Sequence, residues 1–187
     1  FEPMVKIAVN SGINRFIYAS SSSVYGVKKE QNVTEEMSLE PLTDYSKFKA
    51  QCEEILLKYT NRGFNTCIVR PATVCGYSPR QRLDVVVNIL TTYAYYKNEI
   101  NVLGGNQLRP NINIFDMCNL YLELLKIDSS IINGNIYNAG YQNHSVLEIA
   151  NMIKEKINKN NIIINLKPTN DNRSYHICSD KIFDELN

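Results

Sequence analysis

One short segment constrains the fold of this chain more than any other. The run Arg15-Phe16-Ile17-Tyr18-Ala19 is apolar and brief, which is typical of a strand buried in a parallel sheet. Four serines, Ser20 to Ser23, follow this run directly. In open α/β sheets, ligands bind beyond the carboxyl ends of the strands. The sequence therefore predicts a parallel α/β sheet with a polar site at the end of this strand.

A tyrosine and a lysine with helical spacing come after the serines. Thr43 or Asp44 can cap a helix that we expect over residues 45–60. The four-residue spacing places Tyr45 and Lys49 on one face of that helix. A phenol is a poor base at neutral pH because its pKa is about 10, but a neighbouring ammonium favours the phenolate. Together with a serine hydroxyl that holds the substrate oxygen, this pair predicts a proton-transfer site.

The rest of the chain alternates between strand and helix patterns. We expect the apolar stripe of the tyrosine helix at Phe48, Cys52, Ile55, Leu56 and Tyr59. We expect further strands at residues 64–69, 100–103, 134–140 and 162–166, and further helices at residues 4–11, 85–96, 117–127 and 146–158. Asp116 is predicted to be the N-cap of the helix over 117–127, and Ser145 with Glu148 forms a capping box before the last of these helices.

Composition excludes several classes of partner. A net charge of +1 gives no electrostatic basis for binding nucleic acid or a membrane surface. The five cysteines are odd in number and show no CxxC or Cys-His spacing, so we expect no metal site and no disulfide framework. They are typical of reduced thiols in a cytoplasmic protein. No run of eighteen apolar residues is present, so we expect no membrane-spanning segment.

The pattern Ser-Ser-x-x-Val-Tyr-Gly after an apolar strand, followed further on by Tyr-x-x-x-Lys, resembles the extended short-chain dehydrogenase/reductase family. Within that family, it is most similar to the NAD-dependent nucleotide-sugar epimerases and dehydratases. The resemblance implies a partial Rossmann-like doubly wound parallel sheet with a small α/β substrate-binding lobe. Residues 1–77 would be the C-terminal half of the NAD-binding domain, with the catalytic residues. Residues 78–187 would be mainly the substrate lobe, with some segments returning to the Rossmann sheet.

One expected motif is absent. A dinucleotide-binding domain should open with a strand, a glycine-rich turn and a helix. The chain has eight glycines, and none of them forms GxGxxG or GxxGxxG. We therefore expect a fragment that lacks the first half of the nucleotide-binding domain and a short C-terminal tail.

The resemblance implies a role for a defined set of residues. The catalytic residues would be Ser21, Tyr45 and Lys49, with Ser21 chosen because it lies five residues before Gly26. The cofactor would be NAD, with NADP as the alternative, and it would be bound by Ala19, Ser20, Tyr45, Lys49, Pro71 and Ala72. The substrate would be a nucleotide-diphosphate sugar, bound by Ser21, Ser22, Ser23, Tyr45, Thr73, Arg109 and Arg173.

Two of the substrate positions differ in how well they match the family. The family pattern is Arg-Pro-x-Asn-x-x-Gly, and Thr73 stands at the position of the asparagine. Threonine keeps a hydroxyl but lacks the amide pair. Arg109 matches better, because a guanidinium can bind a diphosphate with two parallel hydrogen bonds. Arg80 and Arg82 are loop residues for which we expect solvation rather than phosphate binding.

Ser22 and Ser23 separate the branches of the family. Hexose 4,6-dehydratases carry Asp-Glu at these positions, an acid and a base for removing water. Two serines leave chemistry that needs a single base, which favours a 4-epimerase that oxidises the sugar transiently. Three alternatives stay open: an NAD(P)-dependent ketoreductase, a dehydratase, and an inactive fragment that serves only as a binding or structural remnant. The resemblance also implies a homodimer formed through the tyrosine helix and the helix before it.

Overall fold

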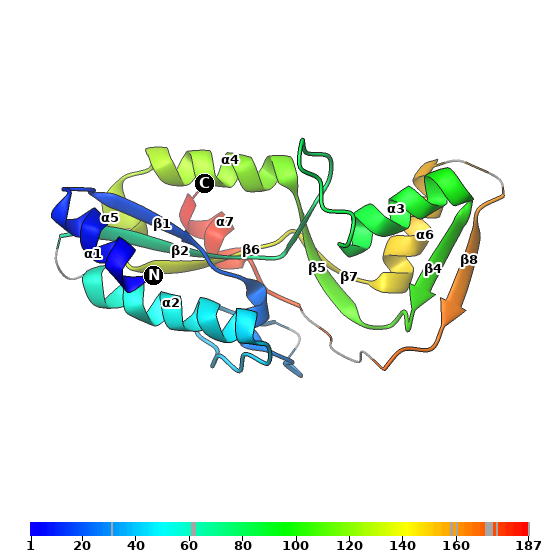
Figure 1. The fold of residues 1–187 in the computed structure, drawn as a ribbon, viewed down its shortest axis with the longest axis horizontal. Helices are drawn as coiled ribbons and strands as arrows, with labels where there is room; N and C mark the ends of the chain where they lie inside the picture. Colours follow the sequence, from blue (N-terminus) through cyan, green and yellow to red (C-terminus); the bar gives the residue numbers. More distant parts are fainter. Residues whose placement is uncertain are drawn as a thin grey trace.

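The computed structural model describes residues 1–30, 32–60, 63–157, 159, 161–170, 174 and 176–186. The molecule is an elongated α/β protein (Figure 1). Its larger part is built on a three-stranded sheet in the order β1-β2-β6, with β1 at Arg15–Ala19, β2 at Asn65–Pro71 and β6 at Asn135–Ala139. Both pairings are parallel. The prediction of a parallel α/β sheet is confirmed.

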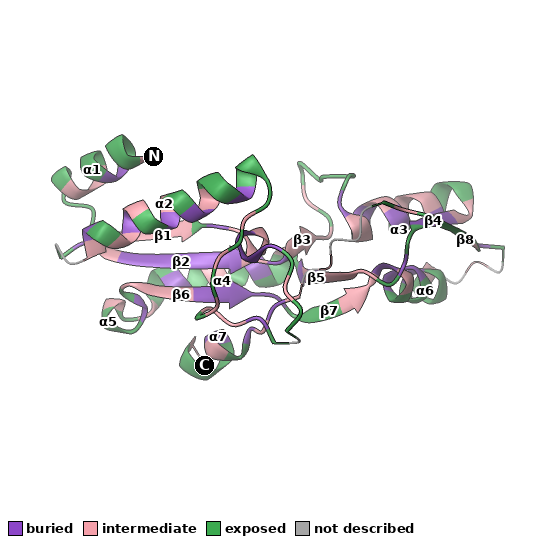
Figure 2. Ribbon diagram, turned by 90° about the horizontal axis from the view of Figure 1, so that it is seen from below, coloured by how far each residue is buried: buried purple, intermediate pink, exposed green. Residues whose placement is uncertain are grey.

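Helices cover both faces of this sheet. Successive side chains of β2 point to opposite faces, and apolar residues on each face pack against helices. Cys67 and Val69 belong to one hydrophobic cluster, which includes Leu124 of α4 (Ile114–Lys126). Ile68, between them, belongs to another cluster, which includes Leu56 of α2 (Asp44–Thr60) and residues of α1 (Glu2–Asn10). Figure 1 shows α4 on one side of the strands and α1 and α2 on the other. β2 is therefore buried on both of its faces, as its colouring in Figure 2 shows.

The smaller part lies at the opposite end of the molecule. There β4 (Glu99–Leu103) pairs in parallel with β8 (Ile163–Lys167), and α3 (Val86–Lys97) and α6 (Val146–Ile157) pack against them. A third sheet joins the two parts, in the order β3 (Thr73–Cys75), β5 (Leu108–Asn113) and β7 (Gln142–Ser145). Three short helices complete the described elements: the 3-10 helix η1 (Ser22–Tyr25), α5 (Ser129–Ile132) and α7 (Asp180–Leu186).

The hydrophobic clusters bear on the domain division between residues 77 and 78, which stays a prediction. Met117, Leu124, Tyr137 and Ile182 come after residue 78, yet they pack in the same cluster as Cys67. The smaller part has its own cluster around α3, β4 and α6. A single cut between residues 77 and 78 would thus separate these segments from the hydrophobic core in which they pack. In the part of the chain that the structure describes, no helix has the length and apolarity needed to cross a membrane.

Helix caps decide where two helices begin. The capping box at Ser145 is confirmed, because Glu148 N donates to Ser145 Oγ at 3.1 Å and Ser145 N donates to the Glu148 carboxylate at 2.7 Å. The N-cap prediction for Asp116 is wrong. Asn113 is the N-cap of α4 and accepts a hydrogen bond from Phe115 N at 2.8 Å. An asparagine three residues earlier offers the same capping chemistry, so Asp116 lies inside the first turn.

The predicted apolar stripe of α2 is only partly correct. Phe48 is 64% exposed, whereas the buried positions are Ser46, Ala50, Glu53, Leu56 and Tyr59. Polar residues occupy the inner face of the first half of this helix because it packs against the polar ends of β1 and β2. Periodicity of apolar residues could not find this face.

Gly26, which ends the Val-Tyr-Gly run, is expected to resist substitution. Its φ of 69° and ψ of −149° lie in a region that is essentially restricted to glycine. A Cβ there would lie 2.1 Å from the Glu40 backbone oxygen. We expect Gly26→Ala to lower the free energy of unfolding by about 3 kcal/mol, measured by urea denaturation.

Gly12→Ala is the matched control for this substitution. Gly12 has a similar φ of 73°, but a Cβ there would meet nothing within 4 Å. Its expected cost is about 1 kcal/mol, from the left-handed backbone alone. Equal losses for the two variants would show that the close approach of Glu40 has no energetic consequence.

Candidate active site

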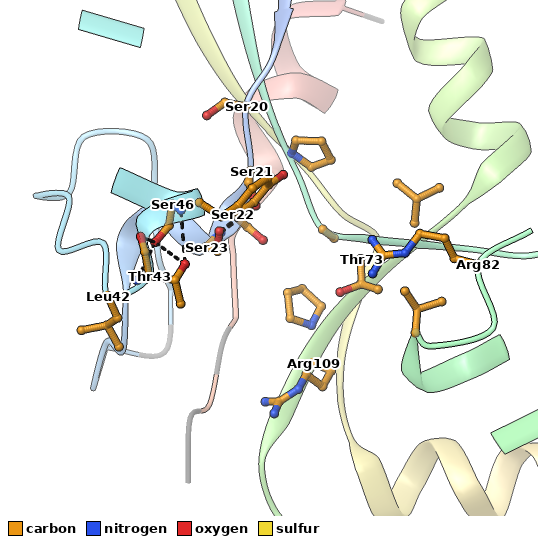
Figure 3. Close-up of a pocket in the computed structure, with 16 residues that line it drawn as sticks. Ser20, Ser21, Ser22, Ser23, Leu42, Thr43, Ser46, Thr73, Arg82 and Arg109 are labelled. Atoms are coloured by element: carbon orange, nitrogen blue, oxygen red, sulfur yellow. Dashed lines mark hydrogen bonds between the residues drawn. The ribbon is translucent and has the colours of Figure 1, made fainter. Parts of the chain in front are cut away.

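A cavity of about 620 Å³ lies at the carboxyl ends of β1 and β2. Figure 3 shows the serines reaching it from the left and Thr73, Arg82 and Arg109 from the right. Most of the predicted site residues line it, namely Ser20, Ser21, Ser22, Ser23, Tyr45, Pro71, Ala72, Thr73 and Arg109. Ala19 and Lys49 lie beside this lining, and Arg173 lies outside the described residues. The tertiary structure thus brings together segments that are separated by up to about half of the chain.

Lys49 connects the tyrosine helix with the end of β1. Its Nζ donates a hydrogen bond to the Ala19 carbonyl oxygen at 2.6 Å. The same Nζ lies 5.6 Å from the ring centroid of Tyr45 and 5.0 Å from that of Tyr18. Burial raises the pKa of the Tyr18 phenol, as does a hydrogen bond with the Cys52 thiol, so Tyr18 stays protonated. Tyr45 is 59% exposed and is therefore the phenol that a ligand can reach.

The start of α2 holds Tyr45 at the cavity. Ser46 N donates to Thr43 Oγ1 at 3.2 Å, and Thr43 N donates to Ser46 Oγ at 3.1 Å. This reciprocal pair, drawn in Figure 3, makes Thr43 the cap rather than Asp44. Because Tyr45 lies in the first turn, these bonds set its position against the serines.

The four serines are not equivalent. Ser21 is the N-cap of η1, and its Oγ accepts from Ser23 N at 3.2 Å and contacts Ser23 Oγ at 2.9 Å. Ser20 is only 4% exposed, and its hydroxyl donates to the Glu53 carboxylate. In Figure 3 the Ser20 hydroxyl lies apart from those of the other three. The cofactor contact predicted for Ser20 therefore involves a residue whose hydroxyl already donates its hydrogen bond to Glu53.

The predicted arginines take different positions. Arg109 lies on β5 and lines the cavity, and its Nη1 donates to the Leu108 carbonyl oxygen at 2.9 Å. Arg82 also lines the cavity, but it forms an ion pair with Asp84 at 2.7 Å in which both side chains are about 70% exposed. Arg80 is exposed and does not line the cavity. Of these three arginines, Arg109 is the one that a strand carries to the cavity.

A second cavity, of about 520 Å³, adjoins the first on the side of the smaller part. Thr73, Val85 and Arg109 line both cavities. The second one also reaches β4 and the Lys167 end of β8. Arg109 therefore lies where the two cavities meet.

A buried ion pair lies beneath the serines, and the sequence interpretation did not single it out. Arg70 and Glu53 are 3% and 2% exposed, and Arg70 Nη2 lies 2.6 Å from Glu53 Oε2. Burial alone would lower the pKa of Arg70, but the hydrogen bonds and charge of Glu53 raise it. One signal was available: Glu53 follows Tyr45 and Lys49 at further four-residue intervals, so all three share a helix face.

The Tyr25 phenol belongs to the same buried group. It donates to Asn138 Oδ1 at 2.7 Å and accepts from Arg70 Nη1 at 2.8 Å. Burial raises the pKa of Tyr25 to about 12, although the charge of Arg70 opposes this shift. Tyr25 is thus a protonated hydrogen-bond donor at neutral pH and not a second base.

Fold and site together define an α/β protein with a cavity at the carboxyl ends of parallel strands, where ligands bind in such sheets, and with serine, tyrosine and lysine gathered there. The chain belongs to the NAD dependent epimerase/dehydratase family, whose model matches residues 2–140. Members of this family are NAD-dependent sugar epimerases and dehydratases, which are enzymes.

Named relatives come from both branches of the family. The chain is 28% identical over 144 residues to the uncharacterized UDP-glucose epimerase YtcB of Bacillus subtilis, covering 76% of this chain and 45% of that protein. It is 27% identical over 191 residues to human dTDP-D-glucose 4,6-dehydratase, covering 96% and 53%. The solved structure of UDP-glucuronic acid 4-epimerase from Bacillus cereus in complex with NAD superposes with a TM-score of 0.82 at 25% identity, covering 99% and 59%. The chain spans about half of the length of these relatives.

Proposed function

We propose that the protein is an NAD-dependent nucleotide-sugar 4-epimerase, which oxidises the sugar at C4 and returns the hydride to the opposite face. One observation carries this proposal. Among the described residues that line the main cavity, Tyr45 is the only titratable side chain besides Arg82 and Arg109, and no Asp, Glu, His or Cys lies there. Dehydration needs an acid and a base that act across two carbons. Epimerisation through a C4 ketone needs one base alone.

The residues present fit a nicotinamide dinucleotide at this edge of the sheet. The Lys49 ammonium has three N–H donors, and the Ala19 carbonyl accepts one of them beside the Tyr45 ring. Lys49, Ala19, Pro71 and Ala72 would hold the nicotinamide and its ribose. When bound, the nicotinamide accepts and then gives back the hydride.

In this proposal, protein side chains transfer the proton. Tyr45, as phenolate, takes the proton of the sugar 4-hydroxyl while the hydride leaves the same carbon. The positive charge of Lys49 lies beside the Tyr45 ring, with its Nζ 5.6 Å from the ring centroid. The Ser21 hydroxyl donates a hydrogen bond to the substrate oxygen as it becomes a carbonyl. After the keto sugar has rotated to present its other face, the hydride returns to C4 and Tyr45 returns the proton to the oxygen, so the reaction is redox-neutral overall.

The proposed substrate is a nucleotide-diphosphate sugar. The sugar would lie in the first cavity against Ser21, Ser22, Ser23 and Tyr45, and the nucleoside would lie toward the second. Thr73 and Arg109 line both cavities, which is where the diphosphate would pass. Arg173 remains a candidate for a second phosphate contact.

Arg109→Ala is expected to weaken binding more than turnover. Removing a charged hydrogen bond to the diphosphate should raise KM about 10- to 100-fold, with kcat changed about threefold at most. Arg80→Ala is the matched control, because Arg80 is an exposed arginine that does not line either cavity. Initial rates at varied substrate concentrations measure both constants. An unchanged KM in Arg109→Ala would remove Arg109 from the substrate site.

Product analysis tests the function itself. The protein as its gene encodes it would be incubated with UDP- and dTDP-hexoses and hexuronic acids in the presence of NAD, and the sugars would be identified by NMR. We expect interconversion of C4 epimers without net consumption of NAD. A 4-keto-6-deoxy sugar would identify a dehydratase, the activity named for the human relative. Stoichiometric oxidation of NADPH would identify a ketoreductase, and either result would overturn the proposal.

We further propose a homodimer formed through α1 and α2. These helices expose the large apolar side chains Met4, Ile7 and Phe48, at 52%, 66% and 64%. Sedimentation of the wild type and of Phe48→Glu would test this assembly. A monomeric wild-type protein would exclude it.

A further inference from the structure

Both ends of the serine segment are tied to one buried ion pair. We propose that Glu53, held by Arg70, is a positioning residue that fixes Ser21 against the tyrosine helix. This inference rests on the proposed function for its catalytic consequence. Its structural content, a tether between Glu53 and the serine segment at residues 20–25, stands on hydrogen bonds and burial alone.

The first tether is at the start of the serine segment. Ser20 Oγ donates to Glu53 Oε1, and Ser20 N donates to the Val69 carbonyl oxygen at 2.7 Å. Ser20 directly precedes Ser21, and Glu53 lies on the same helix face as Tyr45. The carboxylate therefore links the residue beside the proposed oxygen-binding serine to the helix that carries the proposed base.

The second tether is at the other end of the segment. Arg70 donates to both carboxylate oxygens of Glu53, through Nε at 3.1 and 3.2 Å and through Nη2 at 2.6 Å. Its Nη1 donates to the Tyr25 phenol at 2.8 Å and to the Glu35 carbonyl oxygen at 3.2 Å. Tyr25 is the last residue of η1 and is 2% exposed. The four residues between Ser20 and Tyr25 are thus held at both ends by the same pair of charges.

A carboxylate is required at position 53 by the number of bonds it accepts. Its two oxygens accept from Arg70 and from Ser20 at once, and they neutralise a guanidinium that is almost fully buried. A glutamine of the same size would present an amide N–H to one of these donors. Buried ion pairs add little stability over apolar pairs of similar volume, so the gain from this one lies in fixing geometry.

Ser20→Ala tests the tether without breaking the ion pair. The control is Thr66→Val, because Thr66 is a buried residue whose Oγ1 contacts Thr60 Oγ1 at 2.5 Å. That contact joins the same helix and strand at the end away from the cavity. Hydrogen–deuterium exchange would follow the amides of Ser23, Val24 and Gly26, which bond to Ser21 and Ser23. Steady-state kinetics would give kcat and KM for the same proteins.

We expect exchange in Ser20→Ala about tenfold faster at these amides, with kcat about 10- to 100-fold lower and KM within about twofold. Glu53→Gln should show the same pattern more strongly. Thr66→Val should leave exchange at these amides and kcat at the wild-type values. If Glu53→Gln does not fold, Ser20→Ala decides the question alone, because it leaves Arg70 and Glu53 paired.

Two results separate this inference from the proposed function. Unchanged exchange at the three amides in Ser20→Ala, or the same change in Thr66→Val, would overturn the tether even in an active epimerase. A wild-type protein without epimerase activity would overturn the proposed function, and the exchange comparison would still decide whether Glu53 holds the serine segment.

Discussion

Tyr45→Phe is expected to lower kcat by about 10²- to 10⁴-fold, the usual contribution of a positioned acid or base. Phenylalanine keeps the ring beside Lys49 but has no hydroxyl to take the proton of the substrate. Because Tyr45 is 59% exposed, the loss should leave the stability of the protein within about 0.5 kcal/mol of the wild type. Steady-state rates with the sugar identified in the product panel measure the effect.

Tyr96→Phe is the control for this change. Tyr96 is a tyrosine on α3 that is 77% exposed and does not line the main cavity. It should keep wild-type rates. Substrate affinity, measured by calorimetry, should change by less than about threefold in Tyr45→Phe, since the lost interaction acts mainly in the transition state. Turnover within about twofold of the wild type would show that Tyr45 is not the base.

Arg70→Met should have the largest effect on stability. It leaves the Glu53 carboxylate buried without its charged partner, which costs about 3–5 kcal/mol of the free energy of unfolding. Methionine fills much of the volume of the arginine stem, so the loss reports the missing charge rather than a large cavity. Urea denaturation followed by circular dichroism measures the free energy.

The double variant Glu53→Leu with Arg70→Met distinguishes the charge from the packing. Replacing both charges by apolar side chains removes the uncompensated carboxylate, so most of the lost stability should return. The double variant should nevertheless stay impaired in turnover, because Ser20 and Tyr25 lose their common anchor. A single Arg70→Met variant as stable as the wild type would mean that Glu53 finds another partner.

Local patterns were sufficient for most of the elements. The strand at residues 15–19 and the pairing of Ser145 with Glu148 both occur as predicted, because each depends on residues that are adjacent or one helical turn apart. The predicted N-cap of α4 was wrong because two residues with capping side chains, Asn113 and Asp116, lie near the same helix start. Only the backbone that enters the helix decides between them.

The site was predicted less completely than the fold. The sequence placed the serine run at the end of a buried strand and Tyr45 with Lys49 on the helix that follows, and the family resemblance singled out Ser21. The sequence could not show that the Ser20 hydroxyl donates a hydrogen bond to Glu53. An isolated glutamate in a helix pattern is normally a solvated charge, and its burial depends on Arg70, seventeen residues further along the chain.

By itself, the sequence determined the class of fold and placed Tyr45 and Lys49 one helical turn apart, because hydrophobic periodicity and short-range spacing encode strands, helices and one-turn neighbours. Only the tertiary structure decided that the Ser20 hydroxyl bonds to Glu53, that Arg109 and Thr73 line the same cavity, and what lies beneath the site. These features depend on contacts between residues far apart in the chain. Burial of Glu53 with Arg70 is the clearest case, since each charge is stable in the interior only because the other is there.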